Sequence, residues 1–184
     1  MRGFAFSKDE NMKILVSAGH SNVDPGAVAN GYREADIAAE FRNLVAHELR
    51  QAGVEVLTDG EGSDNKPLAE AVKLAGGVGL AVEFHCNAAV NPQARGVESI
   101  SLPAKRDISR RISAAIAGVM ASPLRGDQGW IDQSKTPRGR LAFVNAGGVI
   151  VELFFISNPA ELATYQAKKP ELARAVAAVL LEVR

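Results

Sequence analysis

The sequence has few of the features that mark secreted, membrane-bound or nucleic-acid-binding proteins. Its 184 residues include one cysteine, so no intrachain disulfide can form and the fold needs no oxidising compartment. Basic and acidic residues number 21 each, and this balance offers no general attraction to nucleic acid or to anionic membranes. No apolar run approaches the roughly 20 residues of a membrane span. We therefore expect neither nucleic acid nor a membrane as a partner.

The N-terminus does not have the pattern of a signal peptide. Its opening apolar part is short, and the polar stretch SKDEN interrupts it. Hydrophobic residues make up 47% of the chain, which is enough for a globular core. We expect residues 1–11 to be a tail and residues 12–184 to form a single catalytic domain, which acts as a monomer.

Apolar runs of strand length alternate with helical patterns along the chain. Strands are expected at 13–18, 54–58, 79–85, 96–102, 141–144 and 148–155, and helices at 33–53, 66–77, 106–121, 158–166 and 169–184. The run 96–102 alternates in polarity like an edge or half-exposed strand, and the Gly-, Pro- and charge-rich stretch 123–140 is expected to be a loop. This order predicts an α/β fold of three layers (αβα) with a largely parallel central sheet.

Two of the three histidines follow strand-like runs. His20 comes after 13–18 and His85 ends 79–85, while Glu34 opens the first helix. Sites in parallel sheets collect at the carboxyl ends of the strands, so these side chains can converge if the two strands are neighbours. Turn residues at 24–26 and 30–31 can return the chain from His20 to Glu34. Two imidazoles and one carboxylate suit a zinc ion with an open position for water, which predicts one Zn²⁺ per chain.

A carboxylate also stands in the apolar run VIVELFF. Glu152 is a candidate general base for an amide hydrolase, because burial raises the pKa of a carboxyl group toward a useful value. Each candidate also has a structural explanation. A lone histidine after a strand is usually a loop residue, Glu34 suits a helix dipole, and Glu152 could lie on an edge strand. Cys86 could be a ligand or nucleophile but fits a small buried residue better, and His47 is expected at the surface.

Several separated motifs occur in a characteristic order. They are ILVSAGHSNVDPGA, GYREADIAAEFRNLVAHEL, VEFHCNAA, RGVES and VIVELFFISNPAE. Together they resemble the zinc-dependent N-acetylmuramoyl-L-alanine amidases of the amidase-3 type, which are peptidoglycan hydrolases. The resemblance runs from Lys13 to the C-terminus. It implies that His20, Glu34 and His85 are the zinc ligands and that Glu152 is the catalytic glutamate.

The resemblance also implies a reaction and a setting. The reaction is hydrolysis of the amide between N-acetylmuramic acid and the L-alanine of the peptidoglycan stem peptide. Without an export signal or wall-binding repeat, the chain looks like a phage or prophage endolysin, made in the cytoplasm and acting on the wall or periplasm. A zinc carboxypeptidase acting on wall peptides and a non-catalytic peptidoglycan-binding module are the alternatives.

The sequence departs from the family pattern next to the third ligand. Glu83 and Phe84 stand where a small polar and an aliphatic residue are usual, and Cys86 stands where alanine is common. Because a strand alternates its faces, Glu83 should lie on the side of His85 and could be its partner. The loop 123–140 has a net positive charge and could form one wall of the substrate cleft. The basic residues counted in this loop are Arg125, Lys135, Arg138 and Arg140, and the acidic residues are Asp127 and Asp132.

Overall fold

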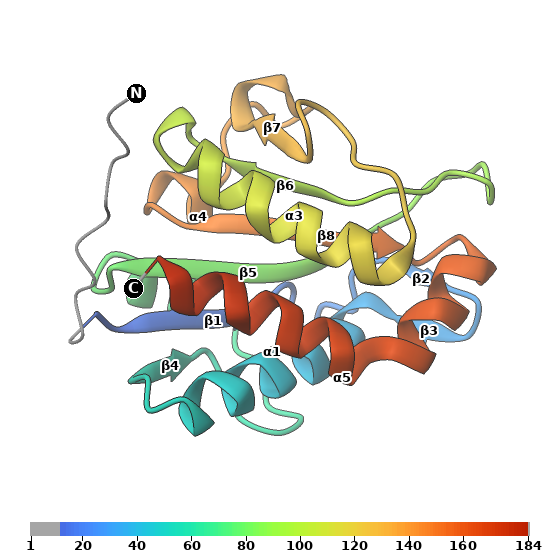
Figure 1. Cartoon of the computed structure of the whole chain (residues 1–184). Helices are drawn as coiled ribbons and strands as arrows, with labels where there is room; N and C mark the ends of the chain where they lie inside the picture. Colours follow the sequence, from blue (N-terminus) through green and yellow to red (C-terminus); the bar gives the residue numbers. More distant parts are fainter. Residues whose placement is uncertain (1–11, 184) are drawn as a thin grey trace.

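A six-stranded sheet forms the centre of the computed structural model, which describes residues 12–183; the tail expected at 1–11 lies outside them. Its strands are β1 Ile14–Ala18, β4 Val56–Thr58, β5 Leu80–Asn87, β6 Glu98–Ser101, β7 Trp130–Asp132 and β8 Val149–Phe155. They lie in the order β4-β1-β5-β8-β6-β7 (Figure 1). Strands β4, β1, β5 and β8 are parallel to one another, whereas β6 is antiparallel to β8 and β7 is parallel to β6. The expected largely parallel sheet is confirmed.

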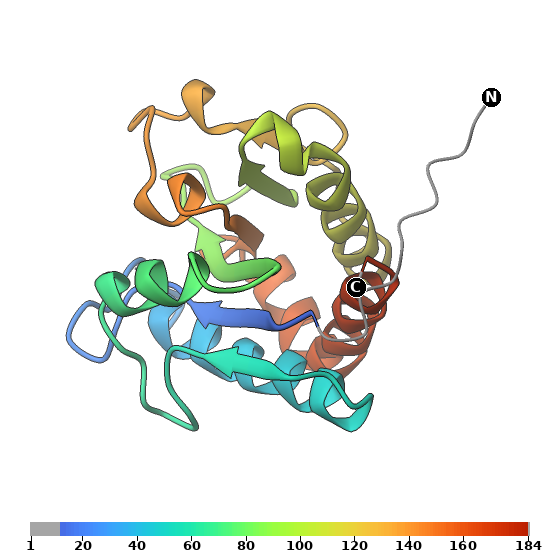
Figure 2. The same cartoon turned by 90° about the vertical axis from the view of Figure 1, so that its left-hand side faces the viewer.

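Helices cover both faces of this sheet. On one face lie α1 Glu34–Gln51, α3 Arg106–Met120 and α5 Pro159–Glu182; on the other lie α2 Leu68–Ala75 and α4 Ala142–Asn145 (Figure 2). Short 3-10 turns, η1 Pro103–Lys105 and η2 Gln133–Lys135, precede α3 and follow β7. The three-layer αβα architecture is therefore confirmed.

The core follows from the two-residue period of the strands. In β1, Ile14 and Val16 pack with α1 and α5, whereas Leu15 packs toward α2 and α4. Because both faces of β1, β5 and β8 are covered, these strands read as nearly continuous apolar runs. On α1, Phe41 and Val45 belong to the buried stripe, and Gly53 with φ of 78° follows the helix end.

Several sequence predictions were wrong in detail. Residues 141–144 were expected as a strand but largely form the helix α4, whose buried Phe143 and Val144 cover the sheet beside α2. The two expected C-terminal helices are one, α5, which continues through Pro170 because apolar side chains before and after that proline enter the same core. The expected loop 123–140 also contains the strand β7.

The strand β6 was expected at an edge or half exposed, but it is buried between β8 and β7. Its polar side chains find partners under α3. Ser99 hydrogen bonds Ser113 at 2.8 Å, and Ser101 accepts from Ser109 at 2.9 Å. Buried hydroxyl groups are tolerated when they are paired in this way, which is why the alternating pattern misled the sequence reading.

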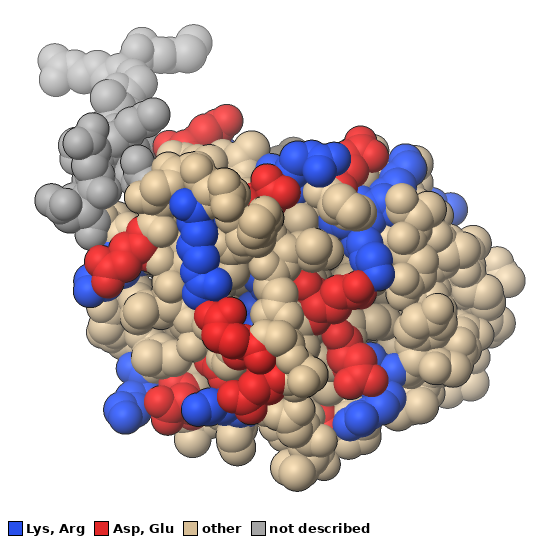
Figure 3. All heavy atoms as spheres, turned by 90° about the horizontal axis from the view of Figure 1, so that it is seen from below, with Lys and Arg blue, Asp and Glu red and all other residues tan. Residues whose placement is uncertain are grey.

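The surface agrees with the balanced composition. On the face shown in Figure 3, basic and acidic side chains lie next to one another. Among the described residues, no helix combines the length and the apolar character needed to cross a bilayer.

Candidate active site

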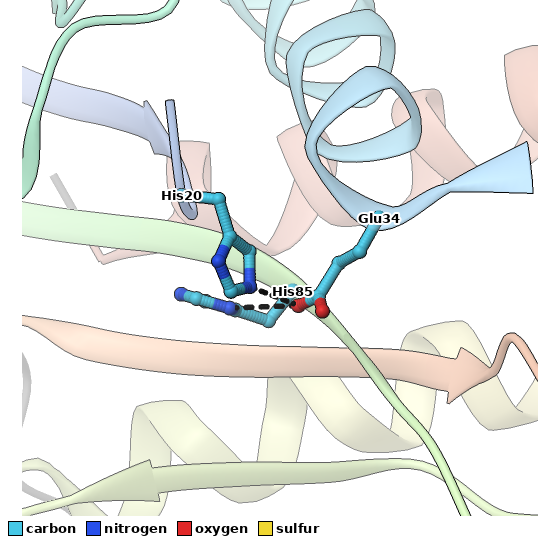
Figure 4. A group of neighbouring side chains, drawn as sticks. All are labelled: His20, Glu34 and His85. Carbon is cyan, nitrogen blue, oxygen red and sulfur yellow. Dashed lines mark hydrogen bonds and ion pairs between the residues drawn. The ribbon is translucent and has the colours of Figure 1, made fainter. Parts of the chain in front are cut away.

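The three predicted ligand residues come from three elements that meet above the sheet. His20 lies just after β1, Glu34 is the first residue of α1, and His85 lies near the carboxyl end of β5, inside the strand rather than after it. Strands β1 and β5 are direct neighbours, with Ala18 opposite Phe84. The three side chains point toward one another in Figure 4, and their ligand atoms all lie within 4.8 Å.

The segment between His20 and Glu34 folds back as predicted. A two-stranded hairpin, β2 Val28–Ala29 and β3 Tyr32–Arg33, turns at Asn30 and Gly31, which both have positive φ. The backbone N–H of Glu34 then donates to the carbonyl of Ala27 at 2.8 Å. This return places the start of α1 beside the end of β1.

Glu34 lies between the two imidazoles. Its Oε1 lies 2.9 Å from Nε2 of His20 and 2.9 Å from Nδ1 of His85, and accepts the backbone N–H of Cys86 at 3.0 Å. Its Oε2 accepts the backbone N–H of Ala27 at 2.9 Å. Asp24, expected as a turn residue, also lies 3.0 Å from the other nitrogen of His20, so that its carboxylate can fix the orientation of the ring.

These contacts change the ionisation of the three groups. Burial opposes the charge on Glu34, but the hydrogen bonds with His20 and His85 outweigh it and hold the pKa of this carboxyl well below its usual range. The hydrogen bond with Glu34 raises the pKa of His20. Burial alone would lower the pKa of His85, but the hydrogen bonds with Glu34 and Glu83 raise it well above its usual value. The site therefore attracts positive charge.

Glu152 lies on β8 directly opposite His85 of β5. Since β8 lies between β5 and β6, the alternative of an edge-strand residue is wrong. Its Oε2 is buried and has no hydrogen-bond partner among the described residues. Burial, reinforced by the charges of Glu34 and Glu98, raises the pKa of Glu152 to about 7 despite the opposing effect of His85. A carboxyl group with this pKa can both take and give a proton near neutral pH.

Glu98 was not identified from the sequence. It is buried on β6, directly opposite Glu152, and is bonded to Asn87 at 3.1 Å and to Arg125 at 2.5 Å. The run 96–102 around Glu98 alternates in polarity, which suggested that Glu98 faces solvent. Only its place in the RGVES motif could have drawn attention to it.

The candidate residues share one open cavity of about 420 Å³, lined by His20, Glu34, His85, Glu98 and Glu152. Thr136, Pro137 and Arg138 form part of its wall, so part of the loop 123–140 does border the site. Of the other charged residues in that loop, Arg125 pairs with Glu98 and Asp127 pairs with Arg110.

The side chains of Cys86 and His47, the one cysteine and the remaining histidine of the chain, do not take part in the site. Cys86 is buried in the main core, where burial raises the pKa of its thiol well above the usual value, so it is not poised as a thiolate. His47 is exposed on α1, away from the site, as predicted.

The charges of the site fit a divalent cation. Glu34, Glu83 and Glu98 are 5%, 2% and 7% exposed, and within residues 12–183 Arg125 is the one arginine or lysine paired with any of them. Buried carboxylates without a compensating charge are costly. Two imidazoles and a carboxylate form a ligand set typical of catalytic zinc.

The family model described as N-acetylmuramoyl-L-alanine amidase (Amidase_3) matches residues 14–182. The chain belongs to this family of peptidoglycan amidases. A solved structure from Neisseria meningitidis, described as a candidate N-acetylmuramoyl-L-alanine amidase, shares 42% identity with a TM-score of 0.86. That comparison covers 93% of this amidase chain and 94% of the Neisseria chain.

Two further relatives are more distant. An N-acetylmuramoyl-L-alanine amidase from Clostridium difficile 630 shares the fold, with a TM-score of 0.79 at 16% identity over 94% of this chain and 96% of that chain. The Bacillus subtilis (strain 168) protein YqiI, described as uncharacterized, is 26% identical over 155 residues, which are 83% of this chain and 74% of YqiI. The family resemblance predicted from the motifs is thus confirmed.

Proposed function

We propose that this protein is a zinc-dependent amidase that hydrolyses the bond between the lactyl group of N-acetylmuramic acid and the L-alanine of the stem peptide. The observation that carries the proposal is the convergence of His20, Glu34 and His85 in one cavity with Glu152, whose Oε2 is unpartnered in the described part of the chain. Family membership supports peptidoglycan amidase activity as its class.

In this proposal His20, Glu34 and His85 hold the metal, and zinc supplies a Lewis acid that polarises the substrate carbonyl and activates water. Glu152 takes a proton from the attacking water and passes it to the nitrogen of L-alanine as the C–N bond breaks. The products are a muramyl carboxylate and a stem peptide with a free amino terminus. Arg138, on the cavity wall, can face the carboxylates of the stem peptide.

Product analysis on purified peptidoglycan tests this reaction. The amidase should release peptides that begin with L-alanine and leave the glycan chains intact. A wall carboxypeptidase would instead free a C-terminal amino acid, and a binding module would release nothing. Elemental analysis should find one zinc per chain, and His85→Ala should lose both zinc and activity. Full zinc content in His85→Ala would overturn the ligand assignment.

We also propose a lytic role of the phage-endolysin type, in which a monomer acts on the wall or the periplasm. The direct passage from β6 through η1 into α3 supports this role, because residues 98–120 contain no additional helix that could serve as an autoinhibitory insert. The pure protein should then degrade isolated sacculi without an activator. Dependence of this activity on a second bacterial protein would contradict the lytic role.

A further inference from the structure

His85 contacts a buried carboxylate on each side of its ring. Its Nδ1 lies 2.9 Å from Oε1 of Glu34, and its Nε2 lies 3.1 Å from Oε1 of Glu83. Glu83 is two residues earlier on β5 and faces the same side of the sheet, as its position in the strand predicts. A neutral imidazole carries one N–H, and a carboxylate can only accept a hydrogen bond. If Nδ1 of His85 and Glu34 both ligate a metal, the one proton of the neutral ring lies on Nε2, where Glu83 can accept it.

Glu83 continues into a buried polar chain that leads away from the cavity. The hydroxyl of Ser17, opposite Glu83 on β1, lies 3.3 Å from Oε2 of Glu83 and 2.8 Å from Oδ2 of Asp59. Oδ1 of Asp59 accepts from Nη1 of Arg42 at 3.1 Å, and the backbone N–H of Ala18 donates to Asp59 at 3.2 Å. These groups come from β1, β5, α1 and the residue that follows β4.

Arg42 anchors the far end of this chain. It is fully buried, and its Nη2 donates to the carbonyls of Gly62 and Asp64 at 3.2 and 2.8 Å. Desolvating a guanidinium and two carboxylates is costly, so the arrangement is stable only when its members are mutually paired. Arg42 and the backbone of Ala18 hold Asp59, and Asp59 keeps the hydroxyl of Ser17 beside Glu83. Ser17 has one hydroxyl proton, which it can donate to either carboxylate, so the group limits the movement of Glu83 next to His85.

We infer that Glu83 is a positioning residue for the metal: it holds the proton of His85 on Nε2 and leaves the lone pair of Nδ1 free to ligate, while Ser17, Asp59 and Arg42 hold Glu83 in place. This inference rests on the proposed zinc-dependent function. A carboxylate on the far nitrogen of a ligating histidine orients the ring and strengthens its binding, and loss of such a partner typically costs about 10–100-fold in metal affinity.

The variant Glu83→Gln keeps the size of the side chain and removes its charge. We expect zinc affinity, measured by competition with a chromophoric chelator, to fall about 10–100-fold. The visible absorption spectrum of the cobalt-substituted protein should also change, because the orientation of one imidazole is no longer fixed. Zinc affinity within twofold of the wild type, with an unchanged cobalt spectrum, would overturn the inference.

Glu161→Gln is the matched control. Glu161 is a carboxylate of similar burial, and it accepts from the backbone N–H groups of Gly96 and Phe155 rather than from a histidine. This variant should lower the melting temperature and leave zinc affinity unchanged. An equal loss of zinc affinity in Glu161→Gln would mean that general destabilisation explains the effect, which would also overturn the inference.

Ser17→Ala decides the case in which Glu83→Gln fails to fold. It removes the hydroxyl between Glu83 and Asp59 and should weaken zinc binding several-fold, whereas unchanged affinity would overturn the inference. The wild-type titration separates this question from the proposed function. Absence of zinc binding by the wild type would overturn the proposed function itself. If the wild type binds zinc and Glu83→Gln binds it with the same affinity, only the role of Glu83 is overturned.

Discussion

Glu152 combines a central position in the sheet with a buried oxygen that has no partner within residues 12–183. If this carboxylate moves the proton, Glu152→Gln should keep the metal, because His20, Glu34 and His85 are untouched. Turnover should fall by about 10²–10⁴-fold, which is the usual contribution of a general acid–base group. The measurement is the rate of amide cleavage on purified peptidoglycan.

Zinc content and thermal melting serve as controls for Glu152→Gln. A folded, zinc-loaded variant with near-normal turnover would exclude Glu152 as the proton carrier. Glu98, which lies opposite it on β6, would then be the next candidate.

The same residue should make the stability of the metal-free protein depend on pH. Burial raises the pKa of Glu152 from 4.5 to about 7. Between these values the folded protein binds a proton that the unfolded chain has released, so stability falls as pH rises and the loss is complete above about pH 7. The shift corresponds to about 3 kcal/mol at most.

In metal-free Glu152→Gln the buried side chain cannot ionise, so this loss of stability at high pH does not occur. In urea titrations this variant should be more stable than metal-free wild type at pH 8 and nearly equal to it at pH 4.5. An advantage of the same size at both pH values would show that it does not come from ionisation of Glu152.

At the scale of elements, the segment from β1 to α1 places two candidate ligands, and one glycine leaves room for both. A Cβ added at Gly26 would lie 2.5 Å from Nε2 of His20 and 2.7 Å from Oε2 of Glu34. Gly26→Ala should therefore displace these side chains and weaken zinc binding about 10-fold or more, as measured by chelator competition.

Gly31→Ala is the control for this segment. Gly31 also has positive φ, at 81°, but an added Cβ would meet nothing within 4 Å. Both variants should lose about 1–2 kcal/mol of stability from the left-handed backbone, yet only Gly26→Ala should lose zinc affinity. Equal zinc affinity in the two variants would show that the segment tolerates a side chain next to the ligands.

At the scale of the whole molecule, the net charge of zero and the mixed surface charges predict poor access to intact Gram-negative cells. The pure protein should leave untreated cells intact and lyse cells whose outer membrane has been opened with chloroform. Turbidity measures both outcomes. Chloroform is preferable to a chelator, which would also remove zinc. Rapid lysis of untreated cells would contradict the prediction.

The amino-acid sequence alone determined the layers of the fold and the four principal candidate residues of the site. Apolar runs and helical stripes report local burial directly, and turn residues at 24–26 and 30–31 report the return of the chain toward Glu34. Two elements were predicted wrongly because packing against neighbours outweighs local preference. The short α4 is a helix where a strand was expected, and the long α5 continues through Pro170 where a break was expected.

Only the tertiary structure decided which polar residues join the site. The position of Glu98 opposite Glu152 depends on strands that are distant in sequence pairing side by side. The pairing of Ser17 with Asp59, and of Asp59 with Arg42, likewise depends on three separate elements meeting. The pattern of polar and apolar residues along a segment predicts which of its side chains are buried. The partner that makes a buried charge tolerable comes from elsewhere in the chain, and only the folded arrangement brings the two together.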